Sequence, residues 1–65
     1  MYDDNLYNLM AQAVEESQSL YRIKNHYVED AENCDQCSKY WKELIEDKEK
    51  HLEDLLKLIK NHINK

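Results

Sequence analysis

The 65-residue sequence contains no glycine and no proline. Turns that require a positive φ usually use glycine, and proline interrupts most loops and helices. A chain with neither residue has few places at which its backbone can reverse, so we expect nearly all of it to be helical. The sequence therefore predicts an all-α protein with one or two breaks formed by Asn, Asp and Cys.

Apolar residues recur along the chain at alternating spacings of four and three. In the first half, the series is Leu6, Met10, Ala13, Ser17, Leu20, Lys24, Tyr27 and Ala31. In the second half, it is Cys37, Trp41, Leu44, Lys48, His51, Leu55, Leu58 and His62. Rows at strict intervals of seven flank the two series: Tyr7, Val14, Tyr21 and Val28, then Ile45, Leu52 and Ile59. This spacing indicates two helices, each with a broad apolar face.

The pattern is interrupted at residues 32–35, where Asn33 and Gln36 approximate a capping box. We therefore predict a single domain, 1–65, with one helix at about 4–32, a turn at about 33–35 and a second helix at about 35–62. So short a connection predicts an antiparallel two-helix hairpin. Each apolar face is too broad for one partner helix, so we expect hairpins to pair as a homodimeric four-helix bundle or a higher homo-oligomer.

The net charge of −5 is carried by the first half of the chain, because residues 33–65 have equal numbers of acids and lysines. Nucleic-acid and membrane-surface binding both need clustered cations, so we exclude them as functions. No segment approaches the ~20 apolar residues of a membrane span. The first ten residues hold two acids and no base, unlike a signal peptide. We therefore expect a cytoplasmic protein with reduced thiols.

The segment Cys34-Asp-Gln-Cys37 is the one motif-like string in the sequence. Two hairpin tips could together supply four thiolates to one zinc ion. A redox role is also open, since a cysteine at a helix N-terminus has a lowered pKa. The third interpretation is structural, with Cys37 a small buried apolar residue and Cys34 an incidental loop thiol.

Several polar residues interrupt the two apolar series at the same level of the predicted hairpin. Antiparallel pairing places His51 level with about Glu16, and Lys48 level with about Ser19 and Leu20. The residues brought within about a turn of one another are Glu16, Ser17, Asp47, Lys48 and His51. Buried charges must be paired. The cluster therefore predicts either a metal site or a metal-free layer of ion pairs.

The stretch from Glu15 to Ile59 resembles one half of a ferritin-like, rubrerythrin-type bundle. The matching features are Glu15-Glu16, Tyr21, Ala31-Glu32, the Trp41–Ile45 segment and Asp47-Lys-Glu-Lys-His51. Some members of that family, such as the encapsulated ferritins, are single hairpins that complete a di-iron site by dimerising. The resemblance would imply Glu16 or Glu15, together with His51, as iron ligands from each subunit.

One position departs from the family pattern. Three residues before His51, where the family has a bridging Glu, this chain has Lys48. An ammonium group cannot bind a metal ion, and Asp47 is a shorter substitute carboxylate at i, i+4 from His51. The more economical interpretation is that Lys48 is an internal cation for Glu16.

Three functions remain open on sequence alone. The first is a small non-enzymatic module that self-associates and presents an acidic surface to a protein partner, with no cofactor. The second is a ferritin-like iron-binding protein with its site at a dimer interface. The third is a zinc or thiol clip formed by Cys34 and Cys37. We expect no enzyme activity, because a catalytic triad or phosphate-binding loop needs glycine turns or a sheet that this chain cannot supply.

Overall fold

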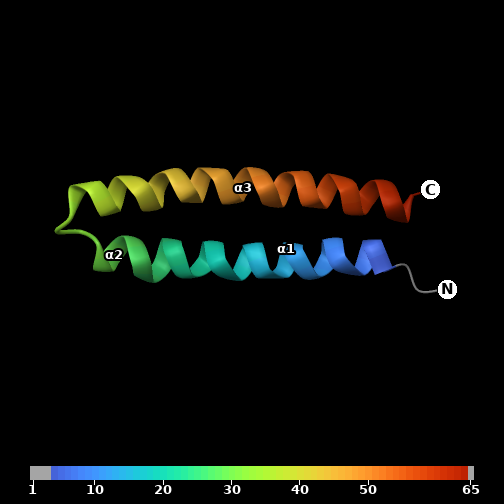
Figure 1. Cartoon of the computed structure of the whole chain (residues 1–65), viewed down its shortest axis with the longest axis horizontal. Coiled ribbons are helices and arrows are strands. Elements are labelled where there is room, and N and C mark those ends of the chain that lie inside the picture. The colour runs from blue at the N-terminus through green and yellow to red at the C-terminus, as the bar shows by residue number, and fades with distance from the viewer. Residues whose placement is uncertain (1–3, 65) are drawn as a thin grey trace.

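The computed structural model describes residues 4–64 (Figure 1). Helix α1 (Asp4–Arg22) continues into a π-helical segment (Ile23–Tyr27) and then into the short helix α2 (Val28–Asp30). After a turn, helix α3 spans Asp35–Ile63. The all-α class predicted from the sequence is confirmed for these residues, which contain no strand.

The helices form a hairpin in which α3 lies alongside α1 and α2 (Figure 1). Near the chain ends, Asn5 Nδ2 lies 3.2 Å from His62 Nε2. Near the turn, the Tyr27 and Trp41 rings pack with their centroids 5.1 Å apart. The hairpin is a rod with dimensions of 51 × 15 × 13 Å. Among residues 4–64, no helical stretch is both long and apolar enough to span a lipid bilayer.

The turn occupies Ala31–Cys34, so the first helical stretch ends at Asp30 rather than at the predicted residue 32. Cys34 is in an extended conformation, and its Sγ accepts a hydrogen bond from the Cys37 amide at 3.3 Å. Cys34 therefore caps α3, and the predicted capping role of Asn33 with Gln36 is wrong. No described residue has a positive φ, which explains how the chain reverses without glycine.

The π-helical segment changes which residues of the first helical stretch face α3. In it, the Val28 amide donates to the Ile23 carbonyl oxygen, five residues earlier. Asn25 Nδ2 donates to the Tyr21 carbonyl oxygen at 2.8 Å, where the hydrogen-bonding pattern changes. Heptad spacing from Ile23 would turn Asp30 inward, but the wider π turn leaves Asp30 exposed and half-buries Val28 instead. The heptad pattern did not predict this segment.

The inward faces agree with the predicted apolar series at some positions and differ from it by one residue at others. In α1, the residues facing inward include Leu9 and Glu16, whereas the predicted Met10 and Ser17 are exposed. In α3, the predicted Cys37, His51 and Leu58 are exposed, and the half-buried residues are Ser38, Trp41, Leu44, Ile45, Lys48, Leu52, Leu55, Ile59 and His62. The predicted flanking row Ile45, Leu52 and Ile59 thus packs within the hairpin. The physical reason is that burying isoleucine and leucine removes more apolar surface from water than burying Ser17 or His51.

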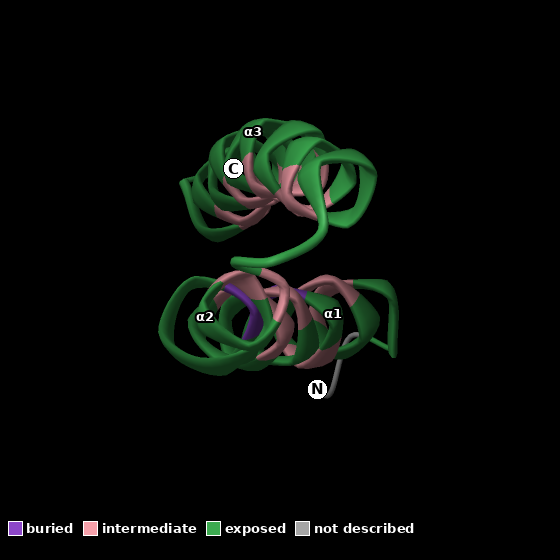
Figure 2. Ribbon diagram, turned by 90° about the vertical axis from the view of Figure 1, so that its left-hand side faces the viewer, coloured by how far each residue is buried: buried purple, intermediate pink, exposed green. Residues whose placement is uncertain are grey.

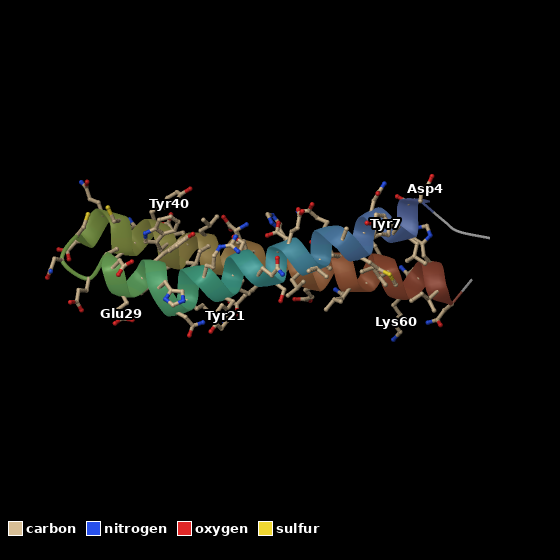
Figure 3. The ribbon with its side chains drawn as sticks, turned by 90° about the horizontal axis from the view of Figure 1, so that it is seen from below. Asp4, Tyr7, Tyr21, Glu29, Tyr40 and Lys60 are labelled. Atoms are coloured by element: carbon tan, nitrogen blue, oxygen red, sulfur yellow. The ribbon has the colours of Figure 1, made fainter. Side chains whose placement is uncertain are left out.

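The apolar interior of the hairpin is small. Within residues 4–64, only Ala13 and Ile23 are buried (Figure 2). The exposed large hydrophobic residues are Tyr7, Met10, Val14, Tyr21, Tyr27, Tyr40, Leu56, Leu58 and Ile63 (Tyr7, Tyr21 and Tyr40 are labelled in Figure 3). A single hairpin therefore leaves much of its apolar surface in contact with water.

Candidate functional site

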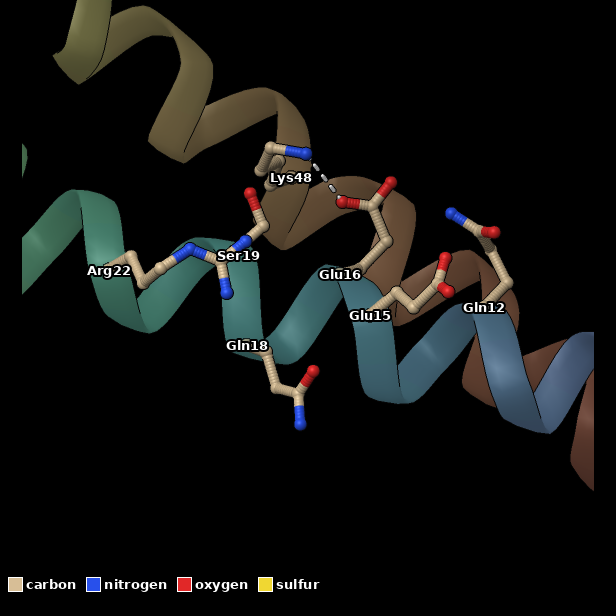
Figure 4. Close-up of a pocket in the computed structure, with 7 residues that line it drawn as sticks. All are labelled: Gln12, Glu15, Glu16, Gln18, Ser19, Arg22 and Lys48. Carbon is tan, nitrogen blue, oxygen red and sulfur yellow. Dashed lines mark hydrogen bonds and ion pairs between the residues drawn. The ribbon is translucent and has the colours of Figure 1, made fainter.

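A polar cluster lies at the middle of the hairpin, where Glu16 of α1 meets Lys48 of α3 (Figure 4). Lys48 Nζ donates a hydrogen bond to Glu16 Oε2 at 2.8 Å. His51 Nδ1 lies 3.4 Å from the other carboxylate oxygen, Oε1. The Glu16 and Lys48 side chains are 12% and 19% exposed, whereas His51 is 59% exposed. We call Glu16, Lys48 and His51 the central polar cluster.

The helical spacing explains why these side chains meet. Glu16 follows Ala13 by three residues and precedes Leu20 by four, so it lies on the inward face of α1. Lys48 occupies the equivalent position between Ile45 and Leu52 in α3. The aliphatic stem of a lysine can cover apolar surface while its ammonium group reaches a charged partner. The cluster therefore replaces one layer of an otherwise apolar interface.

The Glu16 carboxylate is held in its ionised form. The hydrogen bond from Lys48 lowers the pKa of Glu16 below its usual value of 4.5, and partial burial opposes this effect. The positive charge of Lys48 and the neighbouring His51 lower the Glu16 pKa further. At neutral pH, Glu16 and Lys48 therefore form an ion pair that is largely shielded from water.

The other two residues of the predicted cluster lie apart from it. Ser17 and Asp47 are both exposed, and no described hydrogen bond or ion pair joins either of them to Glu16, Lys48 or His51. Within residues 4–64, no group of three or more His, Cys, Asp or Glu side chains is arranged to hold a metal ion. The structure thus brings together three of the five residues predicted to cluster.

The central polar cluster of one chain does not fit an iron site. Lys48 Nζ contacts Glu16 Oε2, and a cation at that oxygen would be repelled by the ammonium group. On the other side of the carboxylate, His51 Nδ1 faces Oε1 directly. A metal ion would have to displace Lys48 and gain further ligands from outside this cluster.

A polar depression of about 390 Å³ adjoins the cluster (Figure 4). It is lined by Gln12, Glu15, Glu16, Gln18, Ser19, Arg22 and Lys48. Of these residues, Ser19 was expected to lie level with Lys48, whereas Gln12, Gln18 and Arg22 were not predicted to take part. The sequence did contain one indication of the depression: Gln12 and Ser19 are polar residues seven apart, next to the row of residues that faces inward.

The two cysteines lie at the hairpin tip, and both are exposed. The prediction that Cys37 is buried is therefore wrong, because α3 directs the position one residue later, Ser38, toward the first helical stretch. Hydrogen bonds from the Cys37 thiol and then from the Cys37 amide lower the pKa of Cys34. The pKa of Cys37 is raised, mainly by its hydrogen bond with Cys34. The two thiols are thus chemically unequal.

A second ion pair connects the helices away from the depression. Lys24 Nζ lies 3.0 Å from Glu49 Oε2, with both side chains about half exposed. Exposed pairs of this kind contribute little to stability. The pair shows that the row of residues containing Lys24 and the row containing Glu49 lie on the same edge of the hairpin.

Comparisons of this chain with protein-family models, with curated proteins and with solved structures found no match.

Proposed function

We propose that the protein is a small non-enzymatic module that self-associates, with two antiparallel hairpins packing as a homodimeric four-helix bundle. The observation that carries this proposal is the small interior of the single hairpin. Only Ala13 and Ile23 are buried among the described residues, while nine large apolar side chains remain exposed. Chains of this size rarely reach adequate stability from one small core and commonly oligomerise.

The surface area of the hairpin supports the same proposal. Its accessible surface is 5287 Å². A compact monomer of this mass would expose about 4,400 Å², so the hairpin exposes roughly 900 Å² more than expected. A standard protein interface buries about 800 Å² on each partner. The excess thus corresponds to one interface per chain.

The charge distribution indicates what such a bundle would present to other proteins. The first half of the chain carries the net charge of −5, and its acids Glu15, Glu29, Asp30 and Glu32 are exposed. A dimer would double this acidic surface, which suits a basic protein partner. We also propose a cytoplasmic location, because Cys34 and Cys37 are free thiols and cysteines are usually kept reduced in that compartment.

Sedimentation equilibrium or light scattering of the purified chain over a range of concentrations tests self-association. We expect twice the chain mass of 7.9 kDa and a melting temperature that rises with protein concentration. A folded, stable monomer at micromolar concentration would overturn the proposal.

A ferritin-like metal-binding function is the second candidate, and the contact between Glu16 and His51 favours it. Glu16 and His51 are the ligands that the family resemblance implies, and His51 Nδ1 lies 3.4 Å from Glu16 Oε1. Elemental analysis of protein purified without an affinity tag tests this function. Near-stoichiometric iron would make metal binding the leading function and would contradict the ion-pair interpretation of Lys48.

A thiol or zinc clip is the third candidate, and the closeness of Cys34 and Cys37 favours it. Cys34 Sγ accepts a hydrogen bond from the Cys37 amide at 3.3 Å, and both thiols are exposed at the tip. Four thiolates from two tips could bind one zinc ion. Equal protection of both cysteines from alkylation, relieved by a chelator, would support this function. Rapid alkylation of both cysteines without a chelator would exclude the zinc clip.

A further inference from the structure

An uncharged stripe runs along the outer side of α1. Its main members, Tyr7, Val14 and Tyr21, are spaced seven residues apart and are 55%, 55% and 63% exposed. Met10 and Ser17 lie between them on the same side of the helix, and both are exposed. We call Tyr7, Met10, Val14, Ser17 and Tyr21 the outer stripe. It bears no charge within the acidic half of the chain, so two copies can meet there without electrostatic repulsion.

The Lys24–Glu49 ion pair shows which part of α3 lies beside the outer stripe. Lys24 follows Met10 and Ser17 at intervals of seven, and Leu56 and Ile63 follow Glu49 at the same interval. Because Lys24 and Glu49 are 3.0 Å apart, the two rows share one edge of the hairpin. Leu56 and Ile63 are exposed on that edge and extend the apolar surface near the chain ends.

The central polar cluster marks the opposite edge. His51 contacts Glu16 from an exposed position, and the row of α3 that contains His51 also contains Leu44 and Leu58. Asp47 and Asp54 lie next to this row, and Glu15 lines the depression on the same edge. Two copies meeting through this edge would bring these acids together. Of the two edges, the outer stripe is therefore the one suited to a second copy.

The π-helical segment sets where the stripe ends. Without it, a regular heptad would continue the row Tyr7, Val14, Tyr21 to Val28. The π turn half-buries Val28 within the hairpin, so the exposed row stops at Tyr21. The stripe is left with a tyrosine near each end and Val14 at its centre. Tyr7 and Tyr21 are then about 21 Å apart along the helix, at 1.5 Å per residue.

We propose that α1 packs against α1 of a second copy, antiparallel, about a two-fold axis that passes close to Val14. In this arrangement Tyr7 of each copy lies against Tyr21 of the other, and the two Val14 side chains meet at the axis. A two-fold interface must be self-complementary, and a stripe with matching ends and a central valine meets that requirement. Tyrosine is enriched at protein interfaces because it combines a large apolar ring with a polar hydroxyl group. This inference rests on the proposed self-association and specifies its geometry.

Disulfide crosslinking tests the geometry directly, in a background in which Cys34→Ser and Cys37→Ser remove the native thiols. We expect Val14→Cys to form a disulfide-linked dimer under mild oxidation. Tyr7→Cys and Tyr21→Cys should each crosslink poorly alone but efficiently when the two variants are mixed. Gln12→Cys is the control, since Gln12 is exposed on the edge of the central polar cluster and should not crosslink.

The outcomes separate the geometry from the proposed function. A dimer by light scattering in which Gln12→Cys crosslinks and Val14→Cys does not would overturn the outer stripe and leave self-association standing. Self-crosslinking of Tyr7→Cys and of Tyr21→Cys would show parallel pairing and overturn the two-fold arrangement. A monomer that does not crosslink at any position would overturn both proposals.

Charge at the centre of the stripe gives a second, independent test. Val14→Glu places two carboxylates at the proposed axis, and glutamate has a higher helix propensity than valine, so the helix itself is not weakened. We expect the dissociation constant to rise by about tenfold or more, as for other central interface positions. Gln12→Glu adds the same charge on the other edge and should leave the dissociation constant unchanged. Equal dissociation constants for the two variants would contradict the proposal.

Discussion

The middle of the hairpin and the part next to the turn are built from different chemistry. Near the turn, Ile23 is 1% exposed and the Tyr27 ring packs on Trp41 at 5.1 Å. In the middle, an ion pair between Glu16 and Lys48 occupies the same interface. Burial of apolar surface contributes about 25 cal/mol per Å², whereas a shielded ion pair adds little net stability over an apolar pair of similar size. The apolar contacts near the turn therefore stabilise the hairpin, and the ion pair in the middle has a different role.

The central polar cluster makes one alignment of the helices preferable to its neighbours. Sliding α3 by one helical turn would leave Glu16 and Lys48 without each other inside a largely apolar interface. Leaving one such charge unpaired costs several kcal/mol, which is more than the pair gains by forming. A polar residue within an apolar heptad seam commonly fixes register in this way. The region near the turn thus provides stability, and the central polar cluster fixes the alignment of α3 with α1.

The largest effect is expected from Ile23→Ala, which removes the most buried side chain near the turn. We expect a loss of about 2–5 kcal/mol in the free energy of unfolding, as for other buried isoleucine truncations. Urea unfolding at a fixed protein concentration measures it. Leu58→Ala, at a half-exposed position, is the control and should cost less than about 1 kcal/mol. Equal losses in the two variants would show that stability is not concentrated near the turn.

The next largest effect is expected from Lys48→Glu, which removes the ion pair in the middle of the hairpin. It leaves Glu16 facing a second carboxylate, so we expect a loss of about 2 kcal/mol at neutral pH, reduced from the fully buried case by partial exposure. The change also creates a Glu-x-x-His pattern with His51. Added iron or zinc should therefore restore stability in proportion to its binding.

Two melting curves of Lys48→Glu, with and without metal, give this measurement. The exposed Lys57→Glu variant, recorded in the same way, should be close to the unmodified protein and insensitive to metal. A Lys48→Glu variant as stable as the unmodified chain in the absence of metal would contradict the pairing of Lys48 with Glu16.

The pH dependence of the middle region should be smaller and has a defined sign. The pKa of Glu16 is lowered in the folded chain, mainly by Lys48, so acid favours the unfolded state. The stabilisation from Glu16 is therefore complete above its usual pKa of 4.5 and is lost as the pH falls through the lower folded value. The difference in unfolding free energy between the unmodified chain and Glu16→Gln, measured from pH 7 to pH 3, should shrink in acid. In a Lys48→Gln background the same difference should vary much less with pH.

A smaller stability change is expected at the turn from Cys34→Ala. This variant removes the side chain that caps α3 and should cost about 0.5–1 kcal/mol, within the usual range for N-cap residues. Cys34→Ser keeps an acceptor for the Cys37 amide and should cost less. Thermal unfolding of the two variants measures the difference, and equal melting temperatures would show that the Cys34 cap contributes nothing.

The last prediction concerns reactivity and involves no stability change. Alkylation requires the thiolate, and the pKa of Cys34 is lowered while that of Cys37 is raised. Both side chains are exposed, so the difference in rate should come from ionisation rather than access. Mass spectrometry of partly alkylated protein at neutral pH should show modification first at Cys34. Faster modification of Cys37 would contradict the hydrogen-bonded arrangement at the tip.

The sequence was sufficient for the helical class, the approximate position of the turn and the meeting of Glu16, Lys48 and His51. These follow from the absent glycine and proline and from counting outward along two helices of similar length. It was not sufficient to decide which of two adjacent rows faces inward. Leu9 and Met10 are both apolar, as are Leu58 and Ile59, so periodicity alone could not separate positions that differ by one residue. Packing of both helices together made that choice.

Two local details depended on interactions that the apolar pattern does not contain. The cap of α3 comes from the Cys34 side chain, since its extended backbone places Sγ next to the Cys37 amide. The π-helical segment contains Asn25, whose side chain donates a hydrogen bond to the Tyr21 carbonyl oxygen. Neither detail changes the spacing of apolar residues before Ile23, so neither was visible in the heptad series.

The π-helical segment gives the first helical stretch two phases, where a regular helix has one. A π turn holds one more residue than an α turn over nearly the same length of axis. The α1 helix before it and the Val28–Ala31 stretch after it thus keep separate phases against α3. Because the two phases differ, Val28 is half-buried against α3 although Tyr21, seven residues earlier, is exposed. The segment therefore offsets the tip of the hairpin from the rest of the first helical stretch, and the tip keeps its own set of inward-facing residues.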